Sequence, residues 1–179
     1  MTARRIIEVV PADPQWPQAF QAEAARIAEV LSGNLIRAHH IGSTAVPHLA
    51  AKPVIDILLE VTDVAALDAQ DHAMEQLGYT PRGELGIPGR RFYLRGLIRR
   101  THHIHAFAAG SQDVRRHLAF RDYLIAHSDV AKQYAGLKQQ CAQACDNDNE
   151  KYCAGKHAFV VEHQDKALAW YEGLGDESA

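Results

Sequence analysis

A glycine–serine pair and an aspartate in an apolar segment are the residues whose types and spacing best suit phosphate chemistry. Residues 44–55 separate Ser43 from Asp56, and Gly42 precedes the serine. Glycine lets the backbone approach a phosphate closely enough for backbone N–H groups and a hydroxyl to bind it. A carboxylate on the next strand can then hold a divalent cation that bridges the same phosphates. Because an unpaired carboxylate in an apolar strand is costly, we expect Asp56 to have a functional role, with a structural hydrogen bond as the alternative.

Two histidines supply a second group of candidate ligands. His103 and His105 are expected on one face of a strand over residues 102–107, because alternate residues of a strand point to the same side. Such a pair can share a metal ion or polarise a phosphate, and the alternative is an ordinary polar sheet face. The sequence has neither a Cys-x-x-Cys nor a His-Glu-x-x-His motif, so a standard zinc site is not indicated.

Basic side chains supply the third group of candidates. Arginines are concentrated in residues 82–100, and we expect Arg91 to neutralise phosphate charge because a guanidinium donates two parallel hydrogen bonds. The alternative is a solvated hairpin. Three lysines and a tyrosine are further candidates for phosphate contacts, with the alternative that the lysine stems lie on apolar surface and their ammonium groups reach water. These four residues are Lys52, Lys138, Tyr152 and Lys156.

Length and composition limit the classes of protein that these residues can belong to. The chain has 179 residues, 47% of them hydrophobic and 23% charged, which is typical of a globular protein rather than a disordered one. A formal net charge of −3 disfavours a general nucleic-acid partner, and no apolar run is long enough to span a membrane. Three cysteines give no disulfide framework, so we expect a cytoplasmic protein. The sequence does not indicate an oligomeric state.

The hydrophobic pattern predicts the elements that must position these residues. We expect an edge strand over 6–10, a helix from Pro14 to Gly33 capped by Asp13, and a helix after Asp63. Further strands are predicted over 35–41, 54–61, 91–97 and 102–107, and helices dominate from Ser111 onward. The prediction is therefore an α+β fold, with a small mixed β-sheet and flanking helices followed by a helical C-terminal half. Residues 1–110 would form the core and residues 111–179 the helical part.

Several blocks together resemble a known family. The run HIGSTAVPHLAAKPVIDI, the pair His103 and His105, the block 120–124 and the pair Tyr152 and Lys156 are similar to the GrpB family. That family is placed in the nucleotidyltransferase superfamily, which implies a nucleotidyltransferase-like fold, a nucleotide or phosphorylated small molecule as ligand, and Mg²⁺ as cofactor, with Zn²⁺ or Mn²⁺ as alternatives. The resemblance places phosphate contacts at Gly42, Ser43, Thr44, Lys52, Arg91, Lys138, Tyr152 and Lys156, and metal or catalytic roles at Asp56, His103 and His105.

One departure from the superfamily pattern keeps three functions open. The superfamily places two acids around one apolar residue, and here the second of these positions is Leu58, which cannot bind a metal. The first hypothesis is a nucleotidyltransferase in which Asp56 holds the metal and His105 occupies the neighbourhood of the third acid. The second is a non-catalytic ligand-binding domain with a degenerate site, and the third is a metal-dependent hydrolase built on the histidines.

Overall fold

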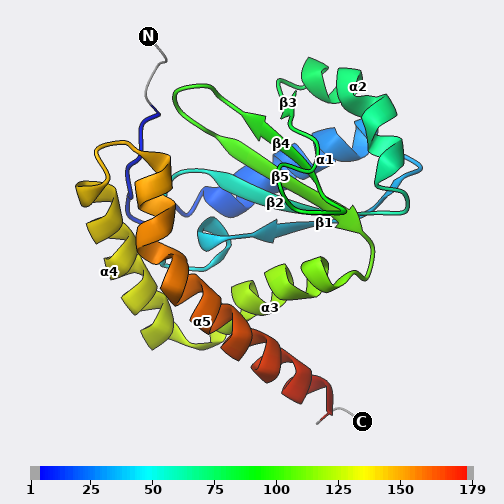
Figure 1. The fold of residues 1–179 in the computed structure, drawn as a ribbon. Coiled ribbons are helices and arrows are strands. Elements are labelled where there is room, and N and C mark those ends of the chain that lie inside the picture. Colours follow the sequence, from blue (N-terminus) through cyan, green and yellow to red (C-terminus); the bar gives the residue numbers. More distant parts are fainter. Residues whose placement is uncertain (1–4, 177–179) are drawn as a thin grey trace.

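The structure, a computed structural model, describes residues 5–176. Figure 1 shows a twisted sheet with helices on both sides and three long helices in the C-terminal half. The elements follow one another along the chain as α1 (Trp16–Val30), β1 (Leu35–Ile41), η1 (Ser43–Ala45), β2 (Ile55–Val61), η2 (Ala65–Gln70), α2 (Asp71–Gln76), β3 (Thr80–Pro81), β4 (Arg91–Arg95), β5 (His102–Ala108), α3 (Gln112–Ala126), α4 (Ser128–Ala144) and α5 (Asn149–Asp176).

The sheet is mixed and has its two apolar strands at its centre. The strand order is β1-β2-β5-β4-β3, in which β2 and β5 are parallel and the other neighbours are antiparallel. The parallel register places Asp56 beside His103 and Leu58 beside His105. The predicted α+β class is therefore confirmed, and the candidate carboxylate and imidazoles lie on adjacent strands.

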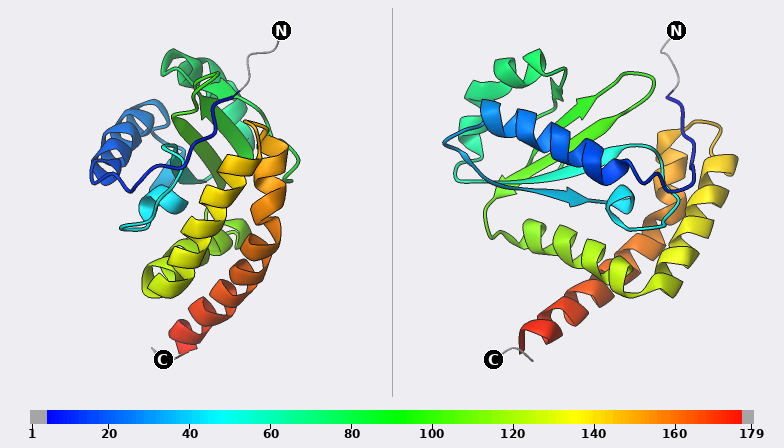
Figure 2. Two further views of the ribbon diagram at one scale, coloured as in Figure 1. Left: turned by 90° about the vertical axis from the view of Figure 1, so that its left-hand side faces the viewer. Right: turned by 180° about the vertical axis from the view of Figure 1, so that it is seen from behind.

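The two faces of the sheet have different roles. One face carries Ile57, Leu59 and Ile104, which form the main core with residues of α1 and α2. The opposite face carries Leu58 and Phe107, which pack against Val114 of α3. Figure 2 shows α1 on one side of the sheet and α4 and α5 beyond the other side. Because side chains alternate along a strand, Asp56, His103 and His105 share the second face.

Three of the predicted elements differ from the structure. Residues 6–10 are not a strand: Val10 forms only an isolated bridge to Ala51. The first helix begins at Trp16. Asp13, the expected cap, accepts a hydrogen bond from the backbone N–H of Gln15 and closes a turn before the helix. The helix expected after Asp63 is divided into the 3₁₀ helix η2 and the short α2.

The C-terminal half is helical, as expected, and it shares apolar contacts with the sheet. Ser111 caps α3 by accepting a hydrogen bond from the backbone N–H of Val114. At the far end, Ile7 of the N-terminal segment packs with Cys145 and Tyr152, where α4 ends and α5 begins. No helix among residues 5–176 is both long and apolar enough to cross a membrane. The boundary near residue 110 stays a prediction.

Candidate functional site

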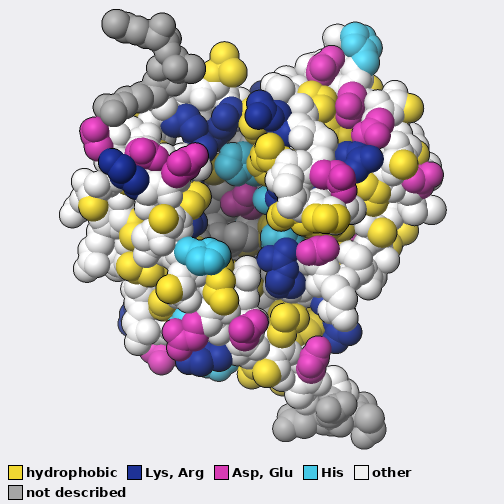
Figure 3. Space-filling view, viewed as in Figure 1, with side chains coloured by type: hydrophobic (Ala, Val, Ile, Leu, Met, Phe, Trp, Pro, Cys, Tyr) yellow, Lys and Arg dark blue, Asp and Glu magenta, His cyan; other side chains and the backbone are white. Residues whose placement is uncertain are grey.

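A cavity of about 450 Å³ opens over the face of the sheet that carries Asp56. Figure 3 shows a hollow at the centre of this face, in which basic and histidine side chains surround an acidic one. The cavity gathers residues from the N-terminal segment, the sheet, the loop before β2 and the helices α4 and α5. The predicted site residues among its lining are Ser43, Thr44, Lys52, Asp56, His103, His105, Lys138, Tyr152 and Lys156.

Asp56 lies at the floor of the cavity between the two predicted histidines. Its Oδ1 atom is 3.5 Å from Nδ1 of His103 and 3.5 Å from Nε2 of His105. Burial alone would raise the pKa of the Asp56 carboxyl, but the two imidazoles outweigh burial and lower that pKa below its ordinary range. The carboxylate is therefore charged at neutral pH.

Gly42 makes room for this carboxylate. Its φ of 72° lies in the region that favours glycine, and a Cβ atom here would lie 2.7 Å from Oδ2 of Asp56. Gly42 is not itself among the residues that line the cavity. Thr44, two residues after Gly42, is buried, and its hydroxyl lies 2.8 Å from Nε2 of His40. Burial lowers the pKa of His40 to about 4, so this imidazole is neutral at pH 7.

The ammonium groups of the three lysines lie against aromatic rings and a carbonyl group rather than against carboxylates. The ammonium groups of Lys52 and Lys156 lie 4.5 Å and 4.8 Å from the ring centre of Tyr152. Lys138 is 2% exposed, and its ammonium donates to the carbonyl of Ala50 at 2.8 Å. Burial, and then repulsion from neighbouring lysines, lowers the pKa of Lys52 to about 8 and that of Lys138 to about 7.

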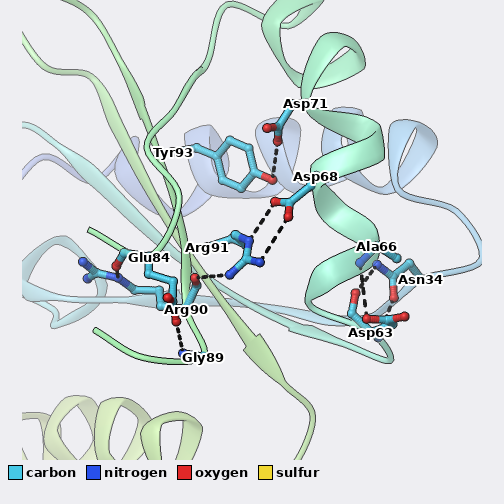
Figure 4. A network of polar contacts seen from close by, with 10 residues as sticks. All are labelled: Asn34, Asp63, Ala66, Asp68, Asp71, Glu84, Gly89, Arg90, Arg91 and Tyr93. Atoms are coloured by element: carbon cyan, nitrogen blue, oxygen red, sulfur yellow. Dashed lines mark hydrogen bonds and ion pairs between the residues drawn. The ribbon is translucent and has the colours of Figure 1, made fainter. Parts of the chain in front are cut away.

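Arg91 does not reach the cavity. Its guanidinium binds the Asp68 carboxylate of η2 at 2.8 Å and 3.1 Å, on the face covered by α1 and α2. Figure 4 shows Arg90 and Arg91 pointing in opposite directions. Strand alternation places Arg90 on the face of His105, and one guanidinium nitrogen lies 3.5 Å from Nδ1 of that histidine. Arg90, and not Arg91, therefore lines the cavity.

The sequence analysis did not single out three further arginines that line the cavity. Arg82 and Arg100 belong to the arginine-rich stretch, whose composition was the available signal, whereas nothing in the sequence singles out Arg5. Among residues 5–176, seven basic side chains line the cavity, and Asp56 is the one carboxylate in its lining. The seven are Arg5, Lys52, Arg82, Arg90, Arg100, Lys138 and Lys156.

The donor set does not fit the expected magnesium ion well. Mg²⁺ prefers carboxylate and phosphate oxygens, whereas Asp56 is flanked here by two imidazoles. Leu58, at the second acid position of the superfamily, is fully buried beneath α3. Glu60 is paired with His39 at 2.6 Å and does not line the cavity. Within residues 5–176, no group of three His, Cys, Asp or Glu side chains is arranged to hold a metal ion.

Comparison with known proteins identifies the family of this chain. A sequence model of the family described as "GrpB protein" matches residues 6–166. The chain belongs to the GrpB family. A GrpB relative, the UPF0157 protein YqkA of Bacillus subtilis, is 41% identical over 95% of this chain, which spans half of that relative's length. The crystal structure of the conserved protein GrpB from Enterococcus faecalis covers 91% of this chain and 98% of its own, at 40% identity and a TM-score of 0.87.

Another solved structure is much less similar. The structure of Cid1 in complex with the UTP analogue UMPNPP covers 73% of this chain and 42% of its own, at 13% identity and a TM-score of 0.39.

Proposed function

We propose that this protein binds a small phosphorylated anion of the nucleotide class in the cavity above Asp56. The observation that carries the proposal is the charge of the lining, with seven basic side chains against a single carboxylate. Clustered like charges in a concave, partly buried site raise the local concentration of ligands of the opposite sign. A volume of about 450 Å³ also suits a small molecule rather than a polymer.

Unsatisfied hydrogen-bond donors support the same ligand. The hydroxyl of Tyr152 and the Nε atoms of Arg5 and Arg100 are buried and have no partner among the described residues. Buried donors are normally satisfied, so three unpaired donors in residues that line the cavity favour a ligand rich in acceptor oxygens. Phosphate offers such acceptors together with the matching charge.

Transfer of a nucleotidyl group is the second candidate function. The contact between Asp56 and His105 favours it, because a carboxylate beside an imidazole is a common arrangement for moving a proton. Leu58 in place of the second acid favours binding without transfer. Mg²⁺ as cofactor stays a prediction, and no step of the proposal depends on it.

Calorimetric titration of two lysine variants on the same helix tests the binding proposal. Lys156 lies in the cavity, whereas Lys166 is an exposed residue of α5 that pairs with Glu162. With ATP and ADP as probes, we expect Lys156→Gln to weaken binding by about tenfold, because it removes a charge-assisted contact. Lys166→Gln, with the same change in net charge, should bind within about twofold of the parent chain.

The same titration also shows which results would contradict the proposed binding. Absence of binding by the parent chain, with or without Mg²⁺, would overturn the proposed function. Equal loss of binding in both variants would show that net charge acts rather than the cavity. Circular dichroism of each variant confirms that the helices are retained.

A further inference from the structure

We infer that the cavity takes a polyphosphate chain as the free anion, with lysine and arginine side chains in the place of a divalent cation. This inference rests on the proposed function and specifies its ligand: a chain of at least two phosphates, bound without metal. It departs from the expectation that Asp56 anchors Mg²⁺, and three features of the cavity support it.

The first feature is a continuous cluster of basic side chains. Lys52 is repelled by Lys156 and Arg5, Lys138 is repelled by Lys156 and Lys52, and Arg100 is repelled by Arg5 and Arg82. These pairwise repulsions link six basic side chains of the cavity lining into one cluster. A single phosphate carries about two negative charges, which would leave most of this cluster uncompensated, whereas a diphosphate or triphosphate extends along it.

The second feature is the way in which the ammonium groups are held. Lys52 and Lys156 lie beside the ring of Tyr152, and Lys138 lies 4.6 Å from the ring centre of Tyr134 and donates to a carbonyl. Within the described chain, none of the three forms an ion pair. Rings and carbonyls orient an ammonium without cancelling its charge. The lysines are therefore oriented by contacts that leave their positive charge available to a ligand.

The third feature is the environment of Asp56. Both nearby imidazoles approach its Oδ1 atom, and its Oδ2 atom faces the backbone at Gly42, where a Cβ would lie 2.7 Å away. The carboxylate is thus already engaged by two imidazoles, whereas Mg²⁺ prefers oxygen ligands and keeps several waters. A metal on the phosphates would also cancel the charge that the basic cluster recognises.

Titration with inorganic tripolyphosphate, with pyrophosphate and with orthophosphate tests the inference. In EDTA we expect tripolyphosphate and pyrophosphate to bind more tightly than orthophosphate, and excess Mg²⁺ to weaken tripolyphosphate binding by about threefold or more. Binding of tripolyphosphate that requires Mg²⁺ would overturn the metal-free inference while leaving the proposed function intact. Binding of no phosphate compound in either buffer would overturn the proposed function itself.

The variant Asp56→Asn distinguishes the two alternative roles of this carboxylate, because they predict opposite changes in ligand affinity. Asp56→Asn removes the one negative charge of the lining, so tripolyphosphate should bind more tightly in EDTA than it does to the parent chain. If Asp56 instead holds a metal, the same variant loses Mg²⁺-dependent binding by about tenfold or more. Asp165→Asn, an exposed position of α5, makes the same change in net charge outside the cavity and should leave the dissociation constant unchanged.

Discussion

Lys138 is the buried basic residue of the cavity whose charge is most costly to hold. Its pKa is lowered to about 7 from an ordinary value of 10.5, chiefly by burial and then by Lys156 and Lys52. Between those two pH values the unfolded chain binds a proton that the folded chain has released. Stability therefore rises with pH across this window, since it increases wherever the unfolded state binds more protons.

The corresponding prediction concerns the pH dependence of unfolding without ligand. The free energy of unfolding should rise between pH 7 and pH 9, with Lys138 contributing at most about 1.4 kcal/mol per pH unit. Lys138→Met should flatten this slope, whereas Lys132→Met, at an exposed position of the same helix, should retain it. Urea unfolding of the three chains at several pH values measures the slopes. Parallel slopes in the parent chain and Lys138→Met would contradict the prediction.

The sequence predicted the centre of the cavity better than its rim. An acid within an apolar strand is easy to recognise as a candidate site residue, because burying its charge is costly unless it has a role. Asp56 does lie in the cavity with both predicted histidines. Arg91 lies outside the cavity, whereas its neighbour Arg90 lines it. Its charge and spacing resemble those of Arg90, and only the register of β4 against β5 decides which of the two faces His105. Arg5 comes from the far N-terminal segment, and local sequence carries no signal for that approach.

At the scale of elements, strands were predicted well where burial determines them. The run over β2 is apolar at nearly every position because both of its faces are covered. The segment 6–10 has the same β-branched composition but lacks a neighbouring strand, since only Val10 bridges to Ala51. Intrinsic preference for a strand was therefore insufficient without a pairing partner.

The contact between α4 and α5 depends on a glycine. A Cβ atom at Gly155 of α5 would lie 2.6 Å from the sulfur of Cys141 of α4. A Cβ atom added at Gly136 of α4, in contrast, would meet no packing neighbour within 4 Å. Replacing a helical glycine by alanine ordinarily stabilises a helix by up to about 1 kcal/mol, so the two sites separate helix preference from packing.

We therefore predict opposite effects for two chemically identical substitutions. Gly136→Ala should raise the free energy of unfolding, and Gly155→Ala should lower it by about 1–3 kcal/mol, because the added methyl overpacks the crossing. Cys141→Ala removes the sulfur, so the double variant with Gly155→Ala should recover most of the loss. Denaturant unfolding of the four chains measures this cycle. Additive effects of the Cys141 and Gly155 substitutions would contradict the proposed clash.

At the scale of the whole molecule, composition conceals the cavity. The chain carries a formal net charge of −3, yet one of its faces gathers seven basic side chains. These residues come from the N-terminal segment, the loop before β2, the strands β4 and β5 with their connections, and the helices α4 and α5. Only the packing of the helical half beside the sheet brings them together, so a net charge that disfavours a nucleic-acid partner does not reveal this local basic cluster.

A ligand in this cavity should therefore join the two halves of the molecule. A polyphosphate that contacts Lys52, before β2, and Lys156, on α5, bridges two segments that already meet at the ring of Tyr152. Because binding to the folded state alone slows local opening, hydrogen exchange should slow on both sides of the cavity. We expect slower exchange in residues 50–54 and 149–156 when tripolyphosphate is added, and no change in η2 and α2 on the opposite face. Lys156→Gln at the same ligand concentration should lose the protection in both segments together, since one ligand connects them. Protection of only one segment, or of η2 and α2 to the same degree, would place the ligand elsewhere.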